Sequence, residues 1–71
     1  MTQHEVRIGA ILIAVATRRV TVDQLRQYLQ IGNRMVADVG AENMPAKMLG
    51  RMAAIKSALK RIEREKAKYL N

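Results

Sequence analysis

The 71-residue chain has no cysteine, tryptophan or phenylalanine, and its only imidazole is that of His4. Without thiols there is no disulfide framework, no thiolate metal site and no thiol nucleophile. One histidine alone cannot form the usual catalytic or metal-binding clusters. We therefore expect neither an enzyme nor a bound metal or cofactor. Because His4 is so near the N-terminus, we expect it in a mobile segment.

Long apolar runs are missing as well. The run IGAILIAVA, from Ile8 to Ala16, is far shorter than the roughly 20 residues of a membrane-spanning helix. Glu5 precedes it and Arg18 and Arg19 follow it, which argues against a secretory signal. We therefore expect a buried helix, no membrane partner and a cytoplasmic location. A chain of this length forms one domain, 1–71, that would be marginally stable as a lone monomer.

Carboxylates are scarce, and the basic excess is uneven. Thirteen Lys and Arg stand against six Asp and Glu, a net charge of +7. Residues 1–45 hold five arginines against four carboxylates, whereas residues 46–71 hold eight bases against two. Such asymmetry indicates an anionic partner, first a nucleic acid and second an acidic protein or a membrane surface. The alternative is that the charge only keeps a small protein in solution.

The apolar spacing predicts an all-α fold of three to four helices. Within 6–17, apolar residues recur on one helical face. Thr21 and Gln24 have the spacing of a capping box, so a second helix should start there and end by Gly40. Asn43 should cap the last helix, with Pro45 in its first turn.

The segment from Gln30 to Asn33 is the predicted break within 21–39. Gly32 permits backbone angles that other residues resist, and Asn33 can cap a following helix. We therefore predict two helices separated by a turn. One unbroken helix remains the alternative, because an internal glycine only weakens a helix.

The stretch from Ile11 to Val39 resembles the DeoR-type helix-turn-helix segment. The matching residues are Ile11-Leu12 and Val15 in the first helix, Val20-Thr21-Val22 at the entry, Asp23-Gln24-Leu25, Tyr28-Leu29, Ile31 in the turn, and Arg34 and Val36. No hairpin wing follows, and the second motif helix carries no net charge. The resemblance implies a helix-turn-helix-like body over 8–41, followed by a basic C-terminal helix over 44–70.

The resemblance also implies which residues contact DNA. The residues expected to read base edges in the major groove are Asn33, Arg34, Ala37 and Asp38. Those expected to hold the phosphate backbone beside them are Thr21, Arg18, Arg19 and Arg26.

The C-terminal helix carries an apolar stripe and a basic row. The stripe consists of Met48, Met52, Ile55, Leu59 and Ile62, with the alternating spacing of a coiled-coil seam. It predicts a homodimer, or else it covers the first two helices within one chain. Both uses can also hold together, with the first half packing internally and the second half pairing with a partner. The basic row, Lys56, Lys60, Arg64 and Lys68, either follows a phosphate backbone or is a solvated face.

Two functions follow as hypotheses. The first is a homodimeric DNA-binding transcriptional regulator that contacts double-stranded DNA through the helix-turn-helix and the basic helix. The second is a small helical inhibitor or adaptor that acts on another protein without contacting DNA, of the kind that mobile elements often carry. The neutral charge of the presumed recognition helix favours the second.

Overall fold

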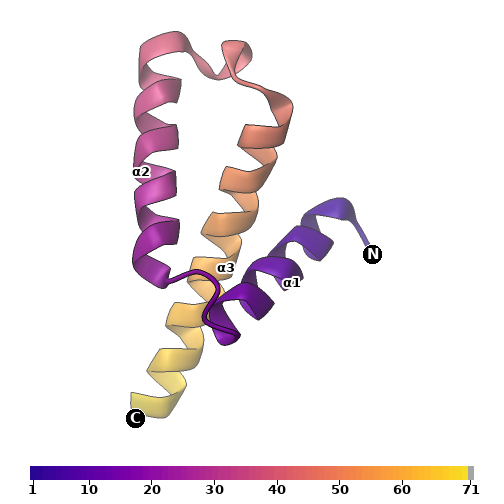
Figure 1. Ribbon diagram of the computed structural model, residues 1–71, viewed down its shortest axis with the longest axis vertical. Coiled ribbons are helices and arrows are strands. Elements are labelled where there is room, and N and C mark those ends of the chain that lie inside the picture. The colour runs from indigo at the N-terminus through magenta and orange to yellow at the C-terminus, as the bar shows by residue number, and fades with distance from the viewer. Residues whose placement is uncertain (71) are drawn as a thin grey trace.

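The structure, a computed structural model, describes residues 1–70 and the side chains of residues 1–66. It consists of helices α1 (Gln3–Ala16), α2 (Val22–Val39) and α3 (Ala46–Leu70), with a short 3₁₀ helix, η1 (Ala41–Asn43), before α3 (Figure 1). Residues 1–70 contain no strand. The fold is all-α, as the sequence predicts.

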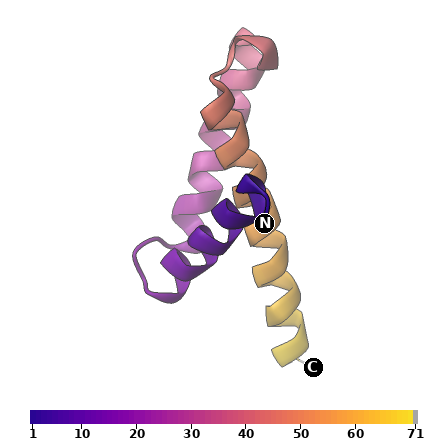
Figure 2. The same ribbon diagram turned by 90° about the vertical axis from the view of Figure 1, so that its right-hand side faces the viewer.

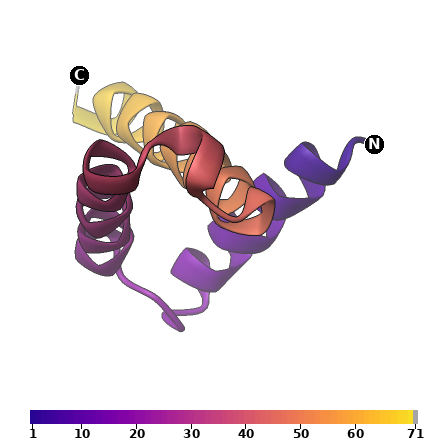
Figure 3. The same ribbon diagram turned by 90° about the horizontal axis from the view of Figure 1, so that it is seen from above.

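Helix α3 is the centre of the arrangement. Both α1 and α2 pack against it, and they diverge from each other at their far ends (Figures 1 and 3). The last turns of α3 extend beyond both partner helices (Figure 2). The molecule is therefore elongated, measuring 41 × 26 × 21 Å.

Helix α1 begins closer to the N-terminus than expected. The Thr2 hydroxyl accepts a hydrogen bond from the Glu5 amide at 3.2 Å and caps the helix. His4 thus lies in the first turn of α1, and its expected place in a mobile segment is wrong. The helix ends in a Schellman motif, in which Arg18 occupies the left-handed region at φ 61°.

Helix α2 begins as predicted and continues where a turn was predicted. The Thr21 hydroxyl accepts from the Gln24 amide at 3.1 Å, and the Gln24 side chain accepts from the Thr21 amide at 2.9 Å, which confirms the capping box. The helix then runs unbroken through Gly32 to Val39 and ends at Gly40, where φ is 86°. The predicted turn at Gln30–Asn33 is wrong, and with it the helix-turn-helix body.

Gly32 is needed for packing instead. It is buried, and a Cβ placed on it would lie 2.7 Å from Sδ and 2.9 Å from Cε of Met52 on α3. The missing side chain allows α2 to approach α3 closely at this point. The backbone freedom that suggested a turn is not used here, because Gly32 keeps a helical conformation.

The core lies along two faces of α3. Ile8 of α1 packs against Ala54 and Ala58, whose side chains are fully buried. Gly50, one turn earlier, lies beneath the guanidinium of Arg7. This row of small residues lets α1 cross α3 at close range. On the other face, Leu25 of α2 packs against Ile55 and Leu59.

The apolar stripe of α3 is used within the chain. Met52, Ile55 and Leu59 retain 5%, 6% and 9% of their exposure, and Met48 and Ile62 are half-buried. Residues that face α1 and α2 in this way are not available to a second chain. Of the two uses that the sequence left open, the structure favours the intramolecular one, and the expected dimer seam is corrected accordingly.

Two smaller features complete the fold. The Asn43 side chain donates to the carbonyl of Val39 at 2.5 Å, so it closes the end of α2 and does not cap α3 as expected. Within residues 1–70, no helix combines the length and the apolar character that crossing a bilayer requires.

Candidate nucleic-acid interface

A row of cations runs along the exposed side of α3. Lys56, Lys60 and Arg64 are one helical turn apart, and all three are exposed. Among the side chains of residues 1–66, none of them takes part in an ion pair, since both ion pairs in that range belong to Arg26. Their positive charge is therefore available to an external anion.

Part of this row faces a groove between α3 and the start of α1. The groove has a volume of about 350 Å³, and its lining residues are His4, Glu5, Ile8, Ser57, Lys60, Arg61 and Arg64. Nε2 of His4 lies 3.5 Å from Oγ of Ser57 and joins the two walls. We call this feature the basic groove.

The electrostatics of the basic groove suit an oxyanion. Lys60, Arg61 and Arg64 bring three cations together against the single carboxylate of Glu5. The N-terminal end of α1 adds the positive end of a helix dipole. Ser57 contributes a hydroxyl donor, and guanidinium groups can grip a phosphate with two hydrogen bonds. The groove is open and polar, as a backbone phosphate requires.

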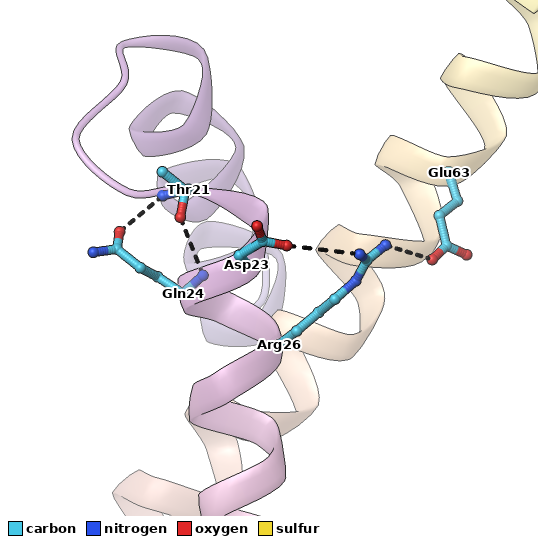
Figure 4. Close-up of polar contacts among 5 residues, drawn as sticks. All are labelled: Thr21, Asp23, Gln24, Arg26 and Glu63. Atoms are coloured by element: carbon cyan, nitrogen blue, oxygen red, sulfur yellow. Dashed lines mark hydrogen bonds and ion pairs between the residues drawn. The ribbon is translucent and has the colours of Figure 1, made fainter.

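The other phosphate contacts expected from the sequence are not part of this groove. The Thr21 hydroxyl is engaged in the cap of α2. Arg26 lies 3.6 Å from a carboxylate oxygen of Glu63 and 3.9 Å from one of Asp23, as Figure 4 shows. Arg18 and Arg19 are exposed in the loop between α1 and α2. Arg26 is thus held by acids of its own chain, while Lys60 and Arg64 meet in the groove.

The residues expected to read bases all lie on α2. Asn33, Arg34, Ala37 and Asp38 are exposed, but they belong to the same helix as the residues expected to precede the turn. A helix-turn-helix requires a turn between the recognition helix and the helix before it. α2 has no such turn, so these residues do not form a separate recognition helix. Arg34 and Asp38 also cancel each other's charge.

A second groove, apolar in character, lies where the three helices meet. Its volume is about 290 Å³, and its lining residues are Arg7, Ala10 and Ile11 of α1, Leu25 and Tyr28 of α2, and Arg51, Ala54 and Ile55 of α3. It forms because α1 and α2 diverge above α3. We call this feature the apolar groove.

Of the residues that line the basic groove, sequence reasoning predicted only Lys60 and Arg64 as site residues. It missed Ile8 and the polar residues His4, Glu5, Ser57 and Arg61. A signal for His4 was present, because Thr2 and Glu5 have the spacing of a helix start. That start extends α1 far enough to carry His4 over α3. Ser57 has no such local signal, since only the crossing of α1 on Gly50, Ala54 and Ala58 brings it to His4.

Comparisons of the chain with protein-family models, with curated proteins and with solved structures give no match. The resemblance to a DeoR-type segment thus gains no support from a relative.

Proposed function

We propose that the protein binds double-stranded DNA through the phosphate backbone, using Lys56 and the basic groove on α3. The observation that carries this proposal is the convergence of Lys60, Arg61 and Arg64 with His4 in one exposed groove. The net charge of +7 supports it. Each cation that neutralises a phosphate releases counterions condensed on the DNA, and this release favours binding. Binding, without catalysis, is the role that this arrangement supports.

The same geometry favours contact with the backbone over reading of bases. α2 is one continuous helix whose exposed face carries a balanced Arg34 and Asp38. α3, by contrast, carries exposed cations, and its last turns extend beyond its partner helices (Figure 2). We therefore expect little sequence preference, and affinity set mainly by the number of phosphates neutralised.

The test is a fluorescence-anisotropy titration of labelled duplex over a series of salt concentrations. The slope of log affinity against log salt should be negative for the native chain. For the variant Lys60→Ala/Arg64→Ala the slope should become shallower by about 2, since each lost phosphate contact removes roughly one unit. An unrelated duplex should compete almost as well as the labelled one.

A matched control has the same loss of charge at other exposed positions. Lys47→Ala/Arg51→Ala also removes two exposed cations, but neither lines the basic groove. Its slope should stay close to that of the native chain. Equal changes in both double variants would mean that only net charge matters, and no binding at low salt would refute the proposal altogether.

A second function, binding of another protein, is favoured by the apolar groove. Its floor is apolar, and Arg7 and Arg51 lie at its edge, which suits a partner helix with an apolar face and acidic flanks. Ala10 is exposed on this groove. Capture of one stoichiometric protein that survives nuclease treatment, and that Ala10→Glu abolishes, would support this function over DNA binding.

A further inference from the structure

Three apolar side chains on α2 remain exposed in the described part of the chain. Ile31, Met35 and Val39 remain 61%, 41% and 48% exposed. They follow one another at intervals of one helical turn, so they form a continuous ridge along α2. We call this ridge the α2 row.

The α2 row is separate from the face that packs on α3. Leu25 and Gly32 are buried on that face, and Val36, next to Met35, is half-buried. The row continues the apolar surface around the helix, towards solvent. Contiguous exposed apolar surface is a feature of protein–protein interaction sites.

We propose that the α2 row is the contact surface for a second copy of this chain, with the two α2 helices crossing antiparallel at Met35. Ridges of residues four apart interdigitate in the commonest class of helix packing. In a two-fold arrangement both copies use the same patch. Met35 then meets its own counterpart, and Ile31 of each copy faces Val39 of the other.

The charges beside the α2 row favour this antiparallel partner. Arg34 and Asp38 lie on the same flank of the row, the side away from α3. Antiparallel pairing brings like flanks together, so Arg34 of one copy faces Asp38 of the other. Arg34 lies one residue before Met35 and Asp38 three residues after it. Their axial offset across the pair is therefore two residues, or about 3 Å.

Within one chain, Arg34 and Asp38 do not satisfy each other. They are four residues apart, but the cation precedes the anion, which is the weaker order for a helical pair. Among the side chains of residues 1–66, they form no ion pair. In a parallel pair, this flank would instead face the side of the partner helix that α3 covers. Arg34 and Asp38 would then meet no opposite charge there. The complementary charges of Arg34 and Asp38 thus favour a second copy of the chain as the partner, and an antiparallel orientation of its α2.

The inference is independent of the proposed DNA binding, and it is tested without DNA. Sedimentation velocity over a hundredfold range of concentration should show the native chain passing from monomer to dimer. Met35→Lys should abolish the dimer, because it places two like charges at the two-fold axis. Ile13→Lys is the matched control, since Ile13 is an apolar residue exposed to 65%, against 41% for Met35, but lies on α1. Its dimer should be unchanged.

Charge exchange gives a sharper test, at exposed positions where folding is not at stake. Arg34→Asp and Asp38→Arg each turn two attractions into repulsions, so each should weaken the dimer about tenfold. The combined exchange Arg34→Asp/Asp38→Arg restores complementarity and should return the affinity to near the native value. Failure of this rescue would refute the antiparallel geometry.

The absence of cysteine allows a direct check of the two-fold axis. Under oxidation, Met35→Cys should form a covalent dimer, because Met35 faces its own counterpart, and Ile13→Cys should not. A chain that stays monomeric at every concentration, or whose dimer survives Met35→Lys, would overturn the proposal. In either case the α2 row is not the contact surface for a second copy.

Discussion

Replacing Gly32 by alanine distinguishes a packing glycine from an ordinary helical one. Alanine is favoured over glycine inside a helix by about 1 kcal/mol. At Gly32, however, the new Cβ would lie 2.7 Å from Sδ, 2.9 Å from Cε and 3.3 Å from Cγ of Met52. Met52 is only 5% exposed, and three of its atoms crowd the site, so rotation of the methyl group alone cannot relieve the contact.

Overpacking of this kind costs about 1–3 kcal/mol. Set against the gain in helix propensity, Gly32→Ala should lower the free energy of unfolding by about 1 kcal/mol. Gly9→Ala is the control, because Gly9 also lies within a helix but an added Cβ would meet nothing within 4 Å. Gly9→Ala should therefore raise the free energy of unfolding by up to about 1 kcal/mol.

The assay is urea denaturation followed by circular dichroism, with Met52→Ala as a second background. Met52→Ala alone should cost about 2–5 kcal/mol by leaving a cavity. In that background the crowding is gone, so Gly32→Ala should become stabilising. If Gly32→Ala stabilises the native chain as Gly9→Ala does, α2 does not approach α3 as described. If it stays destabilising in the Met52→Ala background, Gly32 lies in a turn after all.

Three further substitutions test the ends of the helices. Thr21→Ala removes the cap of α2 and should lower the free energy of unfolding, measured by thermal melting, by about 1 kcal/mol. Thr17→Ala should lower it by less, because the Thr17 hydroxyl donates only to carbonyl oxygens at the end of α1. Arg18→Gly relieves the left-handed conformation at φ 61° and should raise that free energy by about 0.5–1 kcal/mol; a loss of stability would contradict the Schellman motif.

Local signals in the sequence predicted both ends of α2, but not the start of α1 or the role of Asn43. Thr21 and Gln24 cap each other within a few residues, and Gly40 ends α2 with a positive φ. Such features depend on neighbouring backbone groups, so a short stretch determines them. The all-α class follows for the same reason, because the apolar spacing repeats at the helical period throughout the chain.

What the sequence left open depended on contacts between distant segments. A glycine permits a turn and also a close helix contact, and only the position of Met52 on α3 decides between them at Gly32. The stripe through Ile55 and Leu59 has the same pattern whether a second chain or α2 covers it. One helix viewed alone cannot reveal its partner.

The candidate site was likewise predicted only where local spacing determines it. The row through Lys60 and Arg64 was predicted, because residues four apart share a helical face. The groove that gives the row its shape was not, since it needs α1 to cross α3 and bring His4 to Ser57. Arg26, an expected phosphate contact, also forms an ion pair with Glu63 of another helix, which spacing alone does not disclose.

The most direct test of the central claim is an NMR titration of the labelled 71-residue chain with a short duplex at low salt. The account predicts that the backbone and side-chain signals of His4, Lys56, Lys60 and Arg64 shift progressively, while those of 33–38 on α2 stay in place. Shifts confined to 33–38, with the basic groove unaffected, would contradict it.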